Sequence, residues 1–256
     1  MRFLMKNEKI NVRGLDFDNV TMDEAAKAVE ERLASDGKGE PLTVFTPNSE
    51  ILQLCIEQNE YYKIFGSASL IIPDGIGVIK AAKILGTPLK ERVPGVELGE
   101  RVLALAAKDG YKVYFLGGKP GIAEKAAEKM TEKYKGLNVV GFADGYFKKE
   151  GAESDEAVKR ADESGADILF VCLGVPAQEK WIYENKESFR NVKVFLALGG
   201  SLDVYSGTVN RAPAFFRKAG LEWFYRLIKE PKRIGRMMKL PKFLFGTYAY
   251  KLKRKK

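Results

Sequence analysis

The sequence predicts an α/β protein: a Rossmann-like, largely parallel sheet covered by helices on both faces, followed by a basic C-terminal helical appendage. Short apolar runs rich in β-formers alternate with helical patterns along most of the 256 residues. Runs such as ILFVCLG and VKVFLALGG do not alternate between apolar and polar residues, which is typical of strands covered on both faces. Turns containing Gly or Pro follow six of the predicted strands.

The individual elements follow from the same patterns along the chain. The capping box Thr21-Met-Asp-Glu24 opens the first helix, which we expect to end near Ser35. Strands are expected at residues 9–15, 42–46, 69–72, 112–116, 138–142, 167–173 and 192–198. Further helices are expected at residues 49–65, 76–85, 96–108, 121–134, 153–164 and 177–186.

The composition changes between residues 206 and 213. Residues 211–256 hold 15 Lys and Arg but only two Glu, a net charge of +13, whereas the other 210 residues carry a net charge of −4. We therefore expect an α/β body over residues 1–205 and a basic, aromatic-rich appendage over residues 206–256. Such a tail indicates an anionic target, which could be nucleic acid, a phosphate-bearing substrate or a lipid headgroup layer.

Composition also excludes several kinds of site. The chain has no histidine, which excludes Ser-His-Asp and Cys-His catalysis and every His-ligated metal site. Cys55 and Cys172 form no CxxC pattern, so we expect reduced thiols in a cytosolic protein. No apolar run approaches the ~20 residues that cross a bilayer, and the N-terminal residues are too polar for a secretory signal.

The turns after the strands predict a ligand cleft. In open α/β sheets, ligands bind beyond the carboxyl ends of the strands. Glycines there let the backbone approach a phosphate, and the following helix N-termini offer free N–H groups to it. Each turn alone has an ordinary structural explanation, but six together favour a cleft. The six segments are 46–48, 73–77, 117–121, 143–145, 174–178 and 199–203.

Asp74 is the leading candidate for a general base, since without histidine the base must be a carboxylate, a lysine or a tyrosine. It follows an apolar run, so we expect it beside a partly dry cleft. Its alternative role is to cap the helix that follows. Arg92 could bind a phosphate in a bidentate manner or be an ordinary surface arginine. Gln178 could bind a sugar or phosphate oxygen or be solvated.

Other familiar signatures are absent or weak. The chain has no GxxxxGK[ST] loop, and Lys80 stands where a dinucleotide fingerprint begun by Gly75-Ile-Gly77 needs Gly or Ala. Asp16-Phe-Asp18 resembles a DxD metal–sugar-nucleotide motif, but we expect it in the turn between the first strand and the first helix, away from the cleft. Two functions from other classes stay open at this point: a nucleic-acid-binding module and a nucleotide-dependent enzyme such as an NAD oxidoreductase.

Seven motifs occur together in this chain. They are TPN at 46–48, PDGIG at 73–77, RVPG at 92–95, LGGKPG at 116–121, LGVPAQEKW at 173–181, GGSLDVYSG at 199–207 and RAPAFFRKAGLEWFYRLIKEPKR at 211–233. With these motifs the chain resembles the WecG/TagA/CpsF glycosyltransferases, which build bacterial surface polysaccharides. The resemblance covers residues 10–236.

The resemblance implies an inverting, metal-independent transfer from a UDP-sugar donor, without a cofactor, in teichoic acid or surface polysaccharide synthesis. It implies that N-acetylmannosamine passes to the 4-hydroxyl of N-acetylglucosamine on undecaprenyl diphosphate. The alternative is another UDP-sugar, either N-acetylmannosaminuronic acid or a hexose. The implied location is cytoplasmic and peripheral, on the anionic inner face of the cell membrane. Nucleic acid is not an expected partner, and self-association through apolar surfaces is left open.

The resemblance also assigns roles to individual residues. Asp74 matches the family's base, and Thr46 is the second expected catalytic residue. Without a metal ion, arginine side chains are expected to stabilise the departing UDP, and three arginines of the tail are expected to close over its diphosphate. The expected substrate-binding residues are Asn48, Arg92, Gly118, Gln178, Asp203 and the tail residues Arg226, Arg233 and Arg236.

Overall fold

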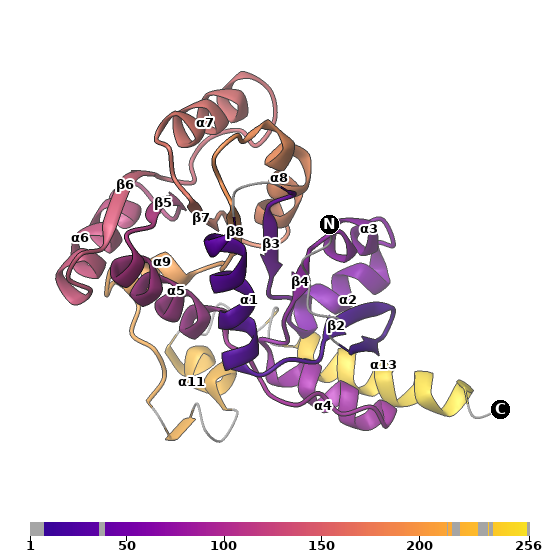
Figure 1. Ribbon diagram of the computed structural model, residues 1–256. Coiled ribbons are helices and arrows are strands. Elements are labelled where there is room, and N and C mark those ends of the chain that lie inside the picture. Colours follow the sequence, from indigo (N-terminus) through magenta and orange to yellow (C-terminus); the bar gives the residue numbers. More distant parts are fainter. Residues whose placement is uncertain are drawn as a thin grey trace.

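The computed structural model describes residues 8–35, 39–213, 215–216, 221–229, 235 and 238–254, without the side chains of Arg226 and Lys229. Its main strands are β3 (Leu42–Phe45), β4 (Leu70–Ile71), β5 (Lys112–Gly117), β6 (Asn138–Ala143), β7 (Ile168–Cys172) and β8 (Val194–Ala197). They form one six-stranded sheet in the order β4-β3-β8-β7-β5-β6, and every pairing is parallel. The predicted α/β class with a parallel sheet is therefore confirmed (Figure 1).

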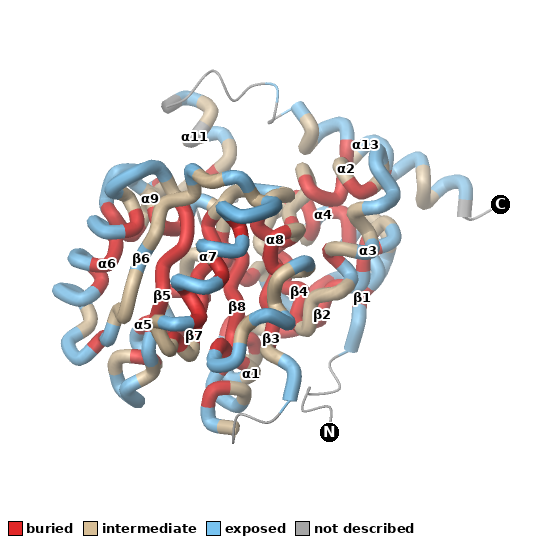
Figure 2. The backbone as a smooth tube through the Cα atoms, turned by 90° about the horizontal axis from the view of Figure 1, so that it is seen from above, coloured by how far each residue is buried: buried red, intermediate tan, exposed pale blue. Residues whose placement is uncertain are grey.

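Helices cover both faces of this sheet because side chains of the strands alternate between two apolar cores. Phe115 and Phe170 point into the first core, whereas Leu116 and Phe195 point into the second. Figure 2 shows the result as the buried strands β5, β7 and β8 between helices whose outer sides are exposed. The first core packs against α1 (Met22–Ala34), α5 (Gly95–Asp109), α6 (Ile122–Lys133) and α9 (Ser201–Tyr205). The second packs against α2 (Ser49–Glu57), α3 (Tyr61–Gly66), α4 (Ile76–Leu85), α7 (Ala152–Glu163) and α8 (Ala177–Asn185), which a short 3-10 helix, η1 (Lys186–Ser188), follows.

The expected single strand over residues 9–15 is wrong. The chain instead forms an antiparallel hairpin of β1 (Lys9–Val12) and β2 (Leu15–Asp18), separate from the parallel sheet. The backbone reverses at Arg13 and Gly14, whose φ angles of 55° and 97° are both positive, as tight hairpin turns require. The hairpin is tied to β4, because the Asp18 carboxylate accepts a hydrogen bond from Ile71 N at 2.8 Å.

The DxD-like segment therefore lies within β2 and not in a turn before the first helix. Asp18 is 3% exposed and pairs with Lys9 Nζ at 2.7 Å, while Asp16 accepts from Asn11 Nδ2 at 2.6 Å. These contacts give both carboxylates a structural explanation.

The helix expected over residues 49–65 is two helices, α2 and α3. Its polar middle, residues 57–60, has no apolar side to bury and is exposed, so the chain bends there and turns Phe65 into the second core. By contrast, the capping box of the first helix is confirmed: Thr21 Oγ1 accepts from Glu24 N, and the Glu24 carboxylate accepts from Thr21 N.

The described part of the tail contains α11 (Glu222–Lys229) and α13 (Lys239–Arg254). Helix α13 lies against α4 and α2, and it buries Phe243 in the second core (Figure 1). Pro241 stands in the first turn of α13, where its missing N–H is tolerated. The boundary between body and appendage at residues 205 and 206 stays a prediction. None of the described helices combines the length and the apolar character needed to cross a membrane.

Candidate active site

The carboxyl ends of the six parallel strands meet at one edge of the sheet, and the strand order fixes the order of the predicted site residues along it. Asp74 follows β4, Thr46 and Asn48 follow β3, Asp203 follows β8, Gln178 follows β7 and Gly118 follows β5. The described residues predicted from strand-end turns are therefore gathered on one edge, in two neighbouring groups.

The first group is built around the segment after β3. The Thr46 hydroxyl donates to the carbonyl oxygen of Ala197, at 3.1 Å, and so joins the ends of β3 and β8. Asn48 caps α2, with its side-chain oxygen accepting from Glu50 N at 2.8 Å and Ile51 N at 3.2 Å. This leaves the amide nitrogen of Asn48 as the end that can donate to a ligand.

Gly75 brings the Asp74 segment against Asn48. A Cβ at Gly75 would lie 2.9 Å from Asn48 Cβ, closer than real Cβ atoms approach, so a larger residue would push the two segments apart. The N-cap residue of α4 is Gly75, so Asp74 stands one residue before the capping position. The Asp74 side chain is 34% exposed, so it is partly shielded from solvent.

Arg92 contacts both Asp74 and the tail. Its Nε donates to the Asp74 carbonyl oxygen at 2.6 Å, and its Nη2 donates to Glu222 Oε2 at 3.0 Å. The same Nη2 lies 3.8 Å from Asp74 Oδ1. With its side chain 22% exposed and held at these points, Arg92 is not an ordinary surface arginine.

The sequence did not predict Glu222, whose contact with Arg92 brings α11 beside Arg92 and Asp74. It is 8% exposed although it belongs to the strongly basic tail. The available signal was its rarity, since it is one of only two acidic residues after position 210.

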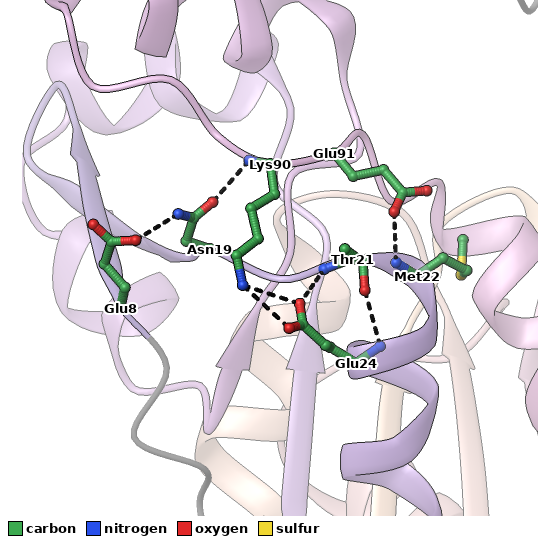
Figure 3. Close-up of polar contacts among 7 residues, drawn as sticks. All are labelled: Glu8, Asn19, Thr21, Met22, Glu24, Lys90 and Glu91. Carbon is green, nitrogen blue, oxygen red and sulfur yellow. Dashed lines mark hydrogen bonds and ion pairs between the residues drawn. The ribbon is translucent and has the colours of Figure 1, made fainter.

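The segment that carries Arg92 is held by hydrogen bonds to the residues between β2 and α1 and to the start of α1 (Figure 3). The backbone N–H of Lys90 donates to Asn19 Oδ1 at 2.8 Å, and the Glu91 carboxylate accepts from Met22 N at 3.1 Å. The Lys90 ammonium also pairs with Glu24, at 3.1 Å, within the capping box of α1. On the other side of Arg92, Val93 N donates to Pro73 O at 2.9 Å. Arg92 is therefore positioned by backbone contacts on both sides as well as by its own side chain.

The second group lies at the ends of β8, β7 and β5. Gln178 is 1% exposed, and its Oε1 accepts from Gly199 N at 3.0 Å, so the solvated alternative is wrong. Asp203, on α9, lies close enough to the end of β7 for its charge to contribute to raising the pKa of Cys172, after burial, which is the main cause. Gly118 N donates to Cys172 O at 3.1 Å, and Gly118 adopts a φ of 74°, which favours glycine.

A pocket of about 360 Å³ lies at the opposite end of the same edge, between the start of α6, the end of β6 and α7. It is lined by the carboxylates of Glu124, Asp144, Glu153 and Glu156, with Arg160 as the one cation in the lining. These carboxylates would repel the diphosphate that the resemblance leads us to expect, and this pocket lies at the far end of the edge from Asp74. We therefore place the candidate site at the ends of β4, β3, β8, β7 and β5.

Three predicted residues lie outside what the structure describes. These are the side chain of Arg226, on α11, and the whole of Arg233 and Arg236. Their expected closure over a diphosphate stays a prediction. Within the described residues, no group of three or more Cys, Asp or Glu is placed to hold a metal ion.

Comparison with known proteins finds the family that the sequence motifs resemble. The model of the glycosyl transferase WecG/TagA/CpsF family matches residues 10–256. A Staphylococcus aureus (strain MRSA252) protein named N-acetylglucosaminyldiphosphoundecaprenol N-acetyl-beta-D-mannosaminyltransferase is 35% identical over 97% of this chain and 95% of its own length. The protein of the same name from strain MW2 is 34% identical over the same shares. A solved branched-chain amino acid ABC transporter ligand-binding protein from Burkholderia xenovorans covers 89% of this chain and 68% of its own at 14% identity, and its TM-score of 0.32 is too low to inform the fold.

Proposed function

This chain belongs to the WecG/TagA/CpsF family of glycosyl transferases, and we propose that it moves N-acetylmannosamine from UDP-N-acetylmannosamine to the 4-hydroxyl of N-acetylglucosamine on undecaprenyl diphosphate. The observation that carries the proposal is 35% identity, over 97% of the chain, to a protein named for transfer of that sugar to that lipid-linked acceptor. The comparisons do not favour a nucleic-acid-binding module or an NAD oxidoreductase.

Asp74 is the proposed general base. Its carboxylate takes the proton of the acceptor hydroxyl as the acceptor oxygen bonds to the anomeric carbon of the donor sugar. The bond from that carbon to the UDP oxygen breaks on the opposite side, so the anomeric configuration inverts and UDP leaves with the electron pair. The position of Asp74 supports this role, because it lies at the tip of β4 with a third of its side chain exposed.

Arg92 is the proposed contact for the leaving diphosphate. An arginine has five N–H donors, and the bonds to Asp74 and Glu222 use two of them. The remaining donors can meet phosphate oxygens, whose negative charge grows as the bond to the sugar breaks. The nearby N-terminus of α4 adds a positive dipole end.

The reaction itself is tested with purified enzyme, a short-chain polyprenyl diphosphate N-acetylglucosamine acceptor and a panel of UDP-sugars. We expect UDP release that depends on acceptor and is fastest with UDP-N-acetylmannosamine. Faster transfer from UDP-N-acetylmannosaminuronic acid or a UDP-hexose would reassign the donor. A thermal midpoint raised by NAD and not by UDP would overturn the glycosyltransferase proposal.

Metal independence is a separate expectation. Transfer should proceed at an unchanged rate in excess EDTA, because arginines and helix N-termini, not a metal ion, are proposed to face the diphosphate. The rate is measured before and after chelation, and again after addition of Mg²⁺ or Mn²⁺. Loss of activity that either metal restores would contradict the expectation and make Asp16 and Asp18 candidate ligands again, in place of their present contacts with Asn11 and with Lys9 and Ile71.

We further propose that α13 docks the enzyme on the membrane that holds the acceptor. Its inner face buries Phe243 and Thr247, whereas Phe245, Tyr248 and Leu252 are 79%, 57% and 53% exposed on its outer side. Their spacing places these three side chains along one stripe of the helix. Lysines and an arginine at the C-terminal end of α13 supply the charge that anionic headgroups attract.

Removing this exposed stripe should weaken membrane binding. A double variant, Phe245→Ser with Leu252→Ser, is expected to reduce partitioning onto phosphatidylglycerol vesicles by about tenfold or more, because both side chains would leave the acyl boundary. Co-sedimentation measures the partitioning, with Tyr146→Ser as the matched control because Tyr146 is 69% exposed on the body. Equal losses in the double variant and in the control would contradict docking through α13. Self-association is checked on the same samples by light scattering.

A further inference from the structure

Glu179 is a buried carboxyl group beside the candidate site that the proposed reaction does not use. It stands in the first turn of α8 and is 0% exposed. Its Oε1 accepts a hydrogen bond from Gln178 Nε2 at 2.9 Å, whereas its Oε2 has no hydrogen-bond partner among the described residues. A polar atom buried in this way is rare and calls for an explanation.

The Gln178 amide links Glu179 to the turn after β8. Its Nε2 donates to Glu179, and its Oε1 accepts from Gly199 N at 3.0 Å. An amide has one accepting end and one donating end. If Glu179 donated a proton to this amide, the amide would have to reverse, and its NH₂ group would then face the Gly199 N–H. An accepting Glu179 therefore selects the orientation that holds Gly199.

Gly199 opens the turn that leads into α9. Its φ of 53° lies in the left-handed region, and Ser201 closes the turn by donating from both N and Oγ to Leu198 O. Two residues later comes Asp203, an expected donor-binding residue. We infer that Glu179 is a positioning residue that, through Gln178, holds the turn from Gly199 to Asp203 in the shape that receives the sugar-nucleotide donor. The donor part of this inference rests on the proposed function.

The ionisation of Glu179 fits this role. Burial raises the pKa of Glu179 to about 7, and hydrogen bonds from the Gln178 amide and from backbone oppose that rise. On α2, across the core, the titratable group that responds to the Glu179 charge is Cys55. Burial raises the pKa of the Cys55 thiol to about 12, so this thiol stays neutral near pH 7. Glu179 is therefore charged above pH about 7 and neutral below it, where the unpartnered Oε2 can carry the proton while Oε1 still accepts from Gln178.

Three variants separate positioning from simple packing. Glu179→Leu removes the acceptor at similar volume, Glu179→Gln keeps an acceptor oxygen without the charge, and Ser154→Ala is the matched control. Ser154 Oγ accepts from Trp181 Nε1 at 2.9 Å, so the control removes a buried hydrogen bond to α8 without touching Gln178. Hydrogen exchange of the peptide covering residues 198–205, followed by mass spectrometry, reports on the turn without any ligand.

We expect the Glu179→Leu variant to exchange this peptide about 10- to 100-fold faster than the wild type and to lose UDP affinity by a similar factor. Glu179→Gln should restore both, and Ser154→Ala should lower Tm while leaving both unchanged. In the wild type, protection and UDP affinity should change little as pH passes through about 7, because the neutral carboxyl still has an oxygen that accepts from Gln178, as the Glu179→Gln variant has.

The Tm of the Glu179→Leu variant distinguishes positioning from a stabilising role. A stabilising Glu179 would make the variant melt lower than the wild type, whereas a positioning Glu179 would not. Because the pKa of folded Glu179 is raised above the ordinary 4.5, the wild type is relatively stabilised at low pH and loses that stability as pH rises through about 7. At pH 8 the Glu179→Leu variant should therefore melt no lower than the wild type. A lower Tm with unchanged exchange at residues 198–205 would overturn the inference. The expected exchange pattern in a protein that does not bind UDP would uphold the positioning and overturn the proposed donor instead.

Discussion

Asp74→Asn is expected to lower the turnover number by about 10²- to 10⁴-fold, the range that general-base catalysis contributes. The substitution keeps the size and the polar character of the side chain but removes the group that accepts the proton. The Arg92 hydrogen bond should survive, because Arg92 Nε donates to the backbone carbonyl of residue 74 and not to its side chain. UDP affinity should therefore change little, and calorimetry with UDP checks this beside the rate.

The control for this prediction is the neighbouring residue Asn48. Asn48→Ala removes the cap of α2 and should lower Tm by the equivalent of about 1 kcal/mol, through loss of the hydrogen bonds to Glu50 N and Ile51 N. Asp74→Asn should leave Tm nearly unchanged, since Gly75 and not Asp74 occupies the N-cap position of α4. If the Asp74→Asn variant retained a near wild-type rate with an intact fold, Asp74 would not be the base.

The sheet could be predicted from the sequence because both of its faces are covered. Runs such as 168–172 are buried at every position, so they lack alternation, and that pattern identifies them without any knowledge of their neighbours. The hairpin escaped because the turn at Arg13 and Gly14 lacks an Asn-Gly or Asp-Gly signal, so two short strands read as one. The order of the strands in the sheet was not predicted either, because it depends on packing between segments that are distant in sequence.

The candidate site was predictable where it depends on strand ends and not where it depends on tertiary partners. A parallel sheet collects the residues after its strands on one edge, so Asp74, Thr46 and Gln178 could be grouped from position alone. The partner of Arg92 could not be predicted from the sequence, because Glu222 lies 130 positions away in a tail whose composition suggests only cations. From the sequence, Glu179 would be expected to be an exposed helical residue. The structure buries it because α8 packs into the second core.

Arg92→Lys is expected to lower the turnover number by about 10²- to 10³-fold, the range measured when one donor to a developing oxyanion is removed. Lysine keeps the positive charge but loses the planar fork, so it cannot hold the Asp74 carbonyl, Glu222 and a phosphate oxygen at once. The loss should fall mainly on kcat and less on the KM of the UDP-sugar, because the negative charge on the diphosphate grows in the transition state.

Glu222→Gln is the matched variant, since a glutamine oxygen can still accept from Arg92 Nη2 at the observed 3.0 Å. It removes the charge that competes with a diphosphate for Arg92 while it keeps the contact between α11 and the site. Its effect on kcat should stay within about tenfold, as expected for the net contribution of one hydrogen bond to a charged group. If the Glu222→Gln variant lost as much kcat as the Arg92→Lys variant, Arg92 would serve to hold α11 in place. Rescue of an Arg92→Ala variant by added guanidine, with Glu222 unchanged, would instead assign the effect to the guanidinium at the leaving group.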